Sequence, residues 1–220
     1  MPQLRAVCRV SRLLPDPGTV GVTAIDKRPV EGPVAVRDLG LYADVQADRA
    51  HHGGPDKALY AYSSTDAQWW SEQLSRPTPP GFFGENLRID GIDLSESVIG
   101  ERWQIGDQVQ VEVTMPRTPC ATFQRYLDEP QWVKLFAAEG RVGAYLRVLR
   151  RGSVQAGDSV VIVAQPTGSV PLRRWFCERR AADAQTLLER DAAGELRIAP
   201  ALREQLERSL AVRDDRVRQS

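Results

Sequence analysis

Residues 108–120 read QVQVEVTMPRTPC, and this stretch joins the clearest strand signal in the chain to one of its three cysteines. Its valines alternate strictly with polar residues, which predicts a β-strand with one apolar face and one polar face. Pro116 ends the strand, and Pro119 fixes the backbone just before Cys120. The sequence therefore predicts a strand that presents a thiol in a stiff setting.

Other short apolar segments also predict strands. Segments 4–14, 19–25, 33–39 and 58–63 are rich in β-branched, aromatic or aliphatic residues and are bounded by turn-forming residues. Residues 159–165, SVVIVAQ, are almost continuously apolar and predict a more buried strand. Many short strands separated by turns indicate a barrel or a folded sheet.

Two helices are expected to interrupt this β-rich part. Residues 63–74, SSTDAQWWSEQL, begin with capping residues and continue with good helix formers. Residues 128–140, DEPQWVKLFAAEG, have Asp128 in position to cap a helix and Gly140 in position to stop it. The fold class expected is mostly β with peripheral helices.

The composition changes after the segment AQPTGSVP. Arg, Glu, Ala and Leu dominate from there on, and three short helices are expected within 170–181, 183–191 and 200–213. Leucines in the last of these recur every four residues and form a narrow apolar stripe. We therefore expect a β-domain over residues 1–167 and a small three-helix domain over 168–220.

Charge and hydropathy exclude several classes of function. Lys+Arg and Asp+Glu both number 29, so the formal net charge is zero, which argues against nucleic acid or a membrane surface as partner. No apolar run approaches the roughly 18 residues that span a bilayer, and the N-terminus lacks the features of a secretory signal. A cytoplasmic location is the default expectation.

The densest polar cluster lies in residues 47–63, ADRAHHGGPDKALYAYS, and holds the only two histidines, of which the second is His52. Gly53 and Gly54 precede a Pro-Asp pair, so a tight loop is expected before Lys57. Glycines beside a lysine can bring backbone N–H groups and a positive charge to a phosphate. The alternative is a solvated hairpin loop, which composition alone favours.

A second cluster, residues 79–96, is rich in glycine and contains Asn86. An amide side chain offers two donors and an acceptor, which suits the edge of a heterocycle. A connecting loop with a structural asparagine is the alternative, and the segment alone favours it.

The cysteines differ in their surroundings. Cys8 and Cys177 lie in segments where a buried, unreactive role is expected. Cys120 follows Arg117 by three residues, and a guanidinium favours the thiolate, which attacks electrophiles and binds soft metals. Arg117 is equally suited to clamp a phosphate.

These clusters, in this order, resemble the MOSC family, which is named for the C-terminal domain of molybdenum cofactor sulfurases. The similarity is greatest to its YiiM-like bacterial branch. It is carried by residues 39–63 with HGGPDKA, by residues 80–107 with FGENL and by residues 109–120 with PRTPC. It covers about residues 18–165, and the combination of the three motifs is more specific than any one of them.

The resemblance implies a MOSC-type β-barrel that binds the molybdenum cofactor (Mo-molybdopterin). The matching cysteine is a thiolate ligand to molybdenum in catalytic relatives, so Cys120 is expected to be the metal ligand. YiiM-like proteins are associated with the reduction of N-hydroxylated bases, and the amidoxime-reducing components are catalytic relatives, so N-hydroxylated compounds are the expected substrates. A separate flavin or iron–sulfur reductase would supply electrons. Pyridoxal phosphate binding is associated only with the family as a whole.

The remaining roles extend this resemblance to single residues. Five residues are expected to bind the cofactor: Arg117 and Lys57 would offset its charge, and Asn86 and the backbone of Gly53 and Gly54 would hold the pterin or its phosphate. His52 and Asp56 are expected to orient groups or relay protons beside Cys120, because histidine titrates near neutrality. Residues 121–123 depart from the pattern of the YiiM-like branch. This departure is expected to alter the entrance through which the substrate reaches the site.

Two other functions stay open at this point. The chain could be a non-catalytic carrier of the cofactor, or of sulfur as a persulfide on Cys120. It could also be a metal-free hydrolase that uses Cys120 with His52 and Asp56, although no protease or nucleophile-elbow signature is present. The helical tail is expected to cover the site, to dock a reductase or to form a homodimer.

Overall fold

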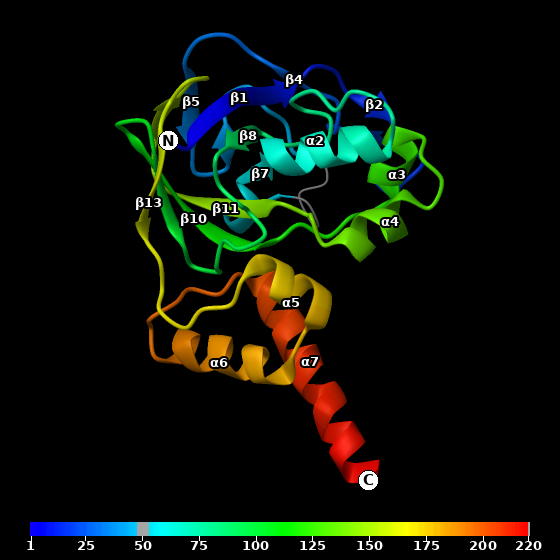
Figure 1. Cartoon of the computed structure of the whole chain (residues 1–220), viewed down its shortest axis with the longest axis vertical. Coiled ribbons are helices and arrows are strands. Elements are labelled where there is room, and N and C mark those ends of the chain that lie inside the picture. Colours follow the sequence, from blue (N-terminus) through cyan, green and yellow to red (C-terminus); the bar gives the residue numbers. More distant parts are fainter. Residues whose placement is uncertain (48–52, 220) are drawn as a thin grey trace.

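The structure is a computed structural model that describes residues 1–47 and 53–219, with side chains as far as residue 211. Its main feature is an eight-stranded sheet (Figure 1). In spatial order the strands are β13 (Val160–Ala164), β9 (Arg102–Ile105), β10 (Val109–Pro116), β11 (Ala144–Arg150), β7 (Leu59–Ser63), β8 (Leu87–Asp90), β1 (Gln3–Val10) and β4 (Lys27–Pro29). Neighbours are antiparallel except β7 and β8, so the sheet is mixed.

Two small sheets complete the β-structure. One has the order β12 (Gly152–Val154), β5 (Val34–Arg37), β6 (Gly40–Leu41), and the other pairs β2 (Leu14–Pro15) with β3 (Val22–Thr23). The second is a hairpin that reaches toward the start of helix α3 (Ala121–Leu127). This contact matters for the site below.

The closed barrel implied by the family resemblance is not formed. A barrel needs a continuous ladder between its first and last strands. Within the described residues, β1 meets the start of β13 only through a single bridge between Gln3 and Ser159, with flanking hydrogen bonds such as Leu4 N to Asp158 O. Figure 1 shows these two segments side by side near the N-terminus. The fold is therefore a mixed α/β arrangement around an open sheet.

The alternating stretch forms β10 as predicted, and it lies in the interior of the sheet between β9 and β11. Its polar face is also buried, with Glu112 5% and Thr114 2% exposed. The prediction of a buried strand over 159–165 is wrong. β13 is the edge strand, and its residues from Val161 to Val163 are 45–51% exposed because it pairs only with β9.

The helices of the β-rich part contribute aromatic side chains to one packed layer. Helix α2 (Ser64–Gln73) begins after Ser63, whose hydroxyl accepts from Asp66 N, as the capping residues predicted. Helix α4 (Trp132–Glu139) ends at Gly140 as predicted. Its predicted start is wrong, because Asp128 ends α3 in a left-handed conformation (φ 49°). The rings that pack against one another in this layer, mostly edge to face, include Trp70, Phe83, Phe123, Trp132 and Phe136.

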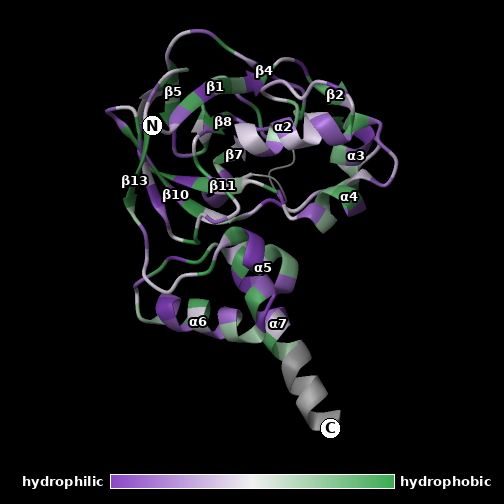
Figure 2. Ribbon diagram, in the orientation of Figure 1, coloured by the Kyte–Doolittle hydropathy of each residue, from purple (hydrophilic) through white to green (hydrophobic). Residues whose placement is uncertain are grey.

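Three helices follow in the C-terminal segment, as predicted: α5 (Leu172–Glu178), α6 (Ala181–Ala192) and α7 (Pro200–Gln219). Figure 1 shows them as a group beyond one end of the sheet, with α7 projecting away. Apolar and polar residues intermix along α5 and α6 in Figure 2, and the side chains of Leu172, Trp175, Ala184 and Leu187 are buried. The predicted leucine stripe holds, since Leu202 and Leu206 are fully buried.

No helix in the part of the chain that the structure describes is long and apolar enough to cross a bilayer.

Candidate functional site

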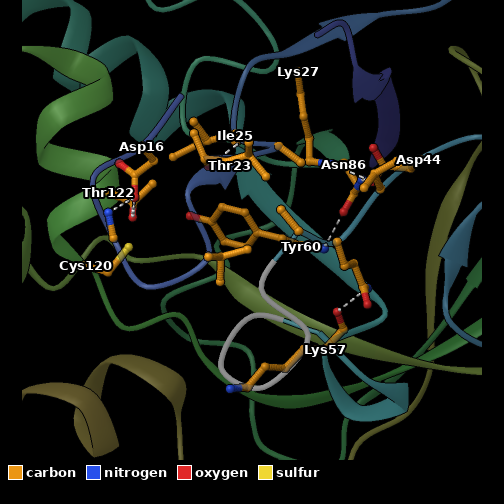
Figure 3. A pocket seen from close by; sticks show the side chains of 18 of the residues that line it. Asp16, Thr23, Ile25, Lys27, Asp44, Lys57, Tyr60, Asn86, Cys120 and Thr122 are labelled. Carbon is orange, nitrogen blue, oxygen red and sulfur yellow. Dashed lines mark hydrogen bonds and ion pairs between the residues drawn. The ribbon is translucent and has the colours of Figure 1, made fainter. Parts of the chain in front are cut away.

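A cavity of about 330 Å³ opens between the β2–β3 hairpin and the end of the large sheet. Figure 3 shows Asp16, Cys120 and Thr122 at one end of it and Lys27, Asp44 and Asn86 at the other, with Tyr60 between them. The cavity collects residues from β4, β7, β11 and the segment after β10, which are far apart in sequence. Four of the predicted site residues line it: Lys57, Asn86, Arg117 and Cys120.

Cys120 lines the cavity and is half-buried, at the point where the chain leaves β10 and enters α3. The hairpin is attached beside it. Asp16 accepts hydrogen bonds from Thr122 Oγ1 at 3.1 Å and from Arg125 Nε and Nη2 at 2.9 and 2.8 Å. Although partial burial raises the pKa of Asp16, these hydrogen bonds and one from Gly18 N lower it on balance. Asp16 is therefore an anion that ties the hairpin to the thiol-bearing turn.

Arg117 lines the same cavity, and its side chain is buried. Its guanidinium carbon lies 3.8 Å from the ring centroid of Phe123 and 5.1 Å from that of Tyr60. Its buried Nη1 atom has no hydrogen-bond partner within the described residues. A buried donor without a partner is costly, so this atom suits an anionic ligand.

Two tyrosines, Tyr60 and Tyr145, line the cavity. Burial raises the pKa of both Tyr60 and Tyr145, and the nearby Arg117 cation opposes that rise. Tyr60 donates its hydroxyl proton to Val142 O at 2.9 Å. The ammonium of Lys57 lies 5.7 Å from the ring centroid of Tyr145, so Lys57 and Arg117 bring two positive charges to the cavity.

Asn86 lines the cavity, but the protein itself uses its amide group. Nδ2 donates to Cys8 O at 3.3 Å and to Asp44 Oδ2 at 2.8 Å, and Oδ1 accepts from Tyr60 N at 3.2 Å. Both donors are thus engaged before any ligand binds. The structure places Asn86 as a support for Asp44 and for the start of β7.

Two residues that sequence reasoning missed lie beside Asn86. Lys27 and Asp44 are largely buried, line the cavity and form an ion pair of 2.5 Å. Asp44 also accepts from Val10 N at 2.8 Å. The available signal was a lysine two residues after the apolar segment 19–25, since a charged residue that becomes buried usually has a partner.

The other predicted residues are placed as follows. Gly54 donates its backbone N–H to Gln46 Oε1 at 3.2 Å, and Gln46 lines the cavity, whereas Gly53 and Gly54 themselves do not. Asp56 faces away from the cavity and pairs with Arg147 Nε at 2.7 Å. His52 lies outside the described residues, so its predicted role remains a prediction.

The other two cysteines differ from Cys120. Cys8 is fully buried, and burial raises its pKa to about 12. Cys177 is exposed on the C-terminal segment, on α5, which contradicts the buried role expected for it. Only Cys120 lies at the cavity.

Comparison with known proteins agrees with this arrangement. The family model described as "MOSC domain" matches residues 48–161, which contain the site motifs from the histidine pair to Cys120. The chain belongs to the MOSC family.

Several known proteins are similar to about two thirds of the chain. The chain is 34% identical over 143 residues to the uncharacterized protein YflK of Bacillus subtilis (strain 168) and 33% identical over 147 residues to protein YiiM of Escherichia coli (strain K12). These matches cover 65% of this chain in both cases, and 64% and 65% of the respective relatives. A protein named "Reductase" from Gibberella moniliformis (strain M3125 / FGSC 7600) is 30% identical over 148 residues, which are 66% of this chain but 26% of that protein.

The MOSC fold is also recognisable in solved structures. The crystal structure of YiiM from Geobacillus stearothermophilus matches with a TM-score of 0.76 and 26% identity, covering 96% of this chain and 100% of that one. The likeness therefore includes the C-terminal helices as well as the part matched by the family model.

The residues at the cavity fit the molybdenum cofactor that this family often binds. A soft sulfur ligand, two cations and an unpartnered buried guanidinium N–H suit a ligand that carries a metal and a phosphate. Among the described side chains, no group of three or more His, Cys, Asp or Glu is placed to hold a metal ion.

Proposed function

We propose that this MOSC protein is a molybdenum-cofactor-dependent reductase of N-hydroxylated compounds. The observation that carries the proposal is the cavity that brings the half-buried Cys120 together with Arg117 and Lys57. The name of the Gibberella relative, "Reductase", supports the same class of activity. The substrates and the partner proteins are part of the proposal.

Each residue has a distinct task in this proposal. Cys120 would be the single protein ligand to the metal, since a thiolate is the soft ligand that such a site needs. Arg117 and Lys57 would balance the negative charge of the cofactor, with the free Nη1 of Arg117 donating to it. Lys27 is held by its ion pair with Asp44 at the far end of the cavity, where its ammonium would donate a hydrogen bond to the ligand.

The reaction requires electrons and protons as well as binding. Conversion of an N-hydroxylated compound to its amine breaks the N–O bond, consumes two electrons and two protons, and releases water. The bound cofactor would supply the two-electron chemistry. A separate flavin or iron–sulfur reductase would deliver those electrons. The protein would hold the substrate in the cavity beside Cys120 and shield it on one side with the hairpin that Asp16 anchors.

The test uses protein expressed in a host that makes the cofactor. Molybdenum and pterin are measured in the wild type, in Cys120→Ala and in Cys177→Ala, which removes a thiol outside the cavity. We expect metal in the wild type and Cys177→Ala but not in Cys120→Ala. With a working electron donor, the loaded protein should reduce N-hydroxylaminopurine or an amidoxime. A loaded protein that is inert on both substrates would contradict the proposal.

A carrier function would give a different result in the same samples. Mass spectrometry would then detect a persulfide on Cys120 in protein that lacks molybdenum. A metal-free hydrolase is less supported, because the carboxylate of Asp56 is engaged by Arg147 and does not line the cavity.

A further inference from the structure

Arg147 joins three separate parts of the molecule at one buried point. It lies on β11 and is 3% exposed. Its Nε donates to Asp56 Oδ1 at 2.7 Å and its Nη1 donates to Glu112 Oε1 at 2.7 Å. Its Nη1 and Nη2 also donate to the backbone carbonyl oxygen of Arg197, at 3.3 and 3.2 Å. We call these four residues the Arg147 junction.

Each partner of Arg147 belongs to a different structural unit. Glu112 belongs to β10, in the interior of the large sheet. Asp56 belongs to the short helix η1 (Pro55–Lys57), immediately before the cavity residue Lys57. Arg197 lies in the segment that links α6 to α7. The guanidinium therefore connects the cavity loop to the C-terminal helices through the sheet.

The helix η1 is held from both sides. Toward the sheet, Thr114 Oγ1 donates to Asp56 O at 2.6 Å. Toward the cavity, Gln46 Nε2 donates to Lys57 O at 3.3 Å. Because Asp56 and Lys57 are adjacent, the anchoring of one carboxylate fixes the backbone from which the Lys57 side chain reaches the cavity.

The linking segment is also held in place within the C-terminal part. Ile198 N donates to Asp191 Oδ1 at 2.9 Å, and Asp191 also pairs with Arg203 on α7. Ile198 and Ala199 are buried. Contacts with α6 and α7 therefore fix the position of the Arg197 carbonyl that accepts from Arg147.

The chemistry of the junction explains why all its members are needed. A buried guanidinium requires both charge balance and partners for its N–H groups, and losing one partner leaves a buried group unsatisfied. Two carboxylates supply the charge, and the Arg197 carbonyl accepts from both terminal nitrogens.

We propose that the C-terminal helical segment positions Lys57 in the cavity through Arg147 and Asp56, which are positioning residues. This rests on the proposed function only in that Lys57 is taken to bind an anionic part of the ligand. The segment 172–211 is then part of the site's framework, in addition to any role in docking a partner.

The first test is hydrogen exchange on the full chain. Asp191→Asn weakens the hold on the linking segment from within the C-terminal part. Asp183→Asn is the matched control, because Asp183 pairs with Arg174 in the same segment but does not contact the junction. We expect the hydrogen-bonded amides of residues 54 and 57 to exchange about tenfold faster in Asp191→Asn and at the wild-type rate in Asp183→Asn. Equal rates at these amides in Asp191→Asn and wild type would overturn the proposal.

The second test measures anion binding by the metal-free protein, with inorganic phosphate as the probe. Asp56→Asn and Lys57→Ala are each expected to weaken phosphate binding several-fold. The double variant should bind no more weakly than Lys57→Ala, because Asp56 acts only through Lys57. Additive losses, or no phosphate binding by the wild type, would contradict the proposal. Neither test needs molybdenum, so a failure of the reductase hypothesis is distinguishable from a failure of this one.

Discussion

The guanidinium of Arg117 stacks on the ring of Phe123, with 3.8 Å between the guanidinium carbon and the ring centroid. Phe123 belongs to α3, the helix that begins directly after Cys120. The same turn of chain therefore places the thiol and holds the ring that supports the cation. Within the described residues, no carboxylate forms an ion pair with Arg117, so its charge remains available to a ligand.

Two substitutions of Arg117 distinguish the contribution of its positive charge from that of its planar guanidinium group. Arg117→Lys keeps a positive charge but loses the planar group that stacks on Phe123. We expect both Arg117→Lys and Arg117→Met to lose most bound molybdenum while remaining folded, because no carboxylate among the described residues would be left unpaired. Metal analysis together with thermal unfolding checks this. Full metal content in Arg117→Met would remove Arg117 from the site.

The three cysteines should differ in reactivity toward an alkylating reagent. Cys8 is fully buried and its pKa is raised to about 12, so it should remain unmodified in the native protein at pH 8. Cys120 and Cys177 are accessible and should be labelled. Mass spectrometry of the native and the denatured protein measures the difference. Cofactor binding should protect Cys120 alone.

Asn86 should matter for structure as well as for binding. Asn86→Ala removes hydrogen bonds to Tyr60 N, Cys8 O and Asp44. We expect the free energy of unfolding to fall by about 2–3 kcal/mol, because buried partners are left unsatisfied. Urea unfolding measures the loss. A variant with unchanged stability would show that these hydrogen bonds contribute little.

Glu85 is expected to be a structural residue in spite of its place in the FGENL motif. It is fully buried and accepts from Gly81 N at 2.7 Å, Phe83 N at 3.0 Å and Arg88 Nε at 2.9 Å. Glu85→Ala leaves Arg88 as an unpaired buried charge and should destabilise the protein by about 3–5 kcal/mol. Denaturation of Glu85→Ala is compared with that of Arg125→Ala. The side chain of Arg125 is 39% exposed, so losing its ion pair with Asp16 should reduce stability far less.

The lowered pKa of Asp16 predicts how the stability of the folded protein depends on pH. Its pKa is lowered in the folded state, so its contribution is present above the unfolded-state pKa of about 3.9 and is lost as the pH falls through the folded-state pKa. Asp16→Asn should therefore be less stable than the wild type at pH 7 by about 1 kcal/mol. The difference should shrink in melts recorded below pH about 4. A difference that stays constant down to pH 2 would exclude the charge of Asp16 as its cause.

Much of the fold could be predicted from local pattern. The alternation of residues 108–115 gave β10, the capping residues gave the start of α2, and Gly140 gave the end of α4. These features depend on neighbours in sequence, so the sequence contains all the information needed. The burial of β13 could not be predicted in this way, because an apolar run does not reveal whether a strand lies inside a sheet or at its edge.

The candidate site could likewise be predicted only in part from the sequence. The order of the motifs was sufficient to identify the family and to select Cys120, Arg117 and Lys57, since residue types and spacing are written in the chain. Only the tertiary structure decided that Lys27 and Asp44 join them, that both donors of Asn86 are already engaged, and that Asp56 turns toward Arg147. Each of these depends on a partner at least 17 residues away, and the direction in which a polar side chain points is set by that distant partner.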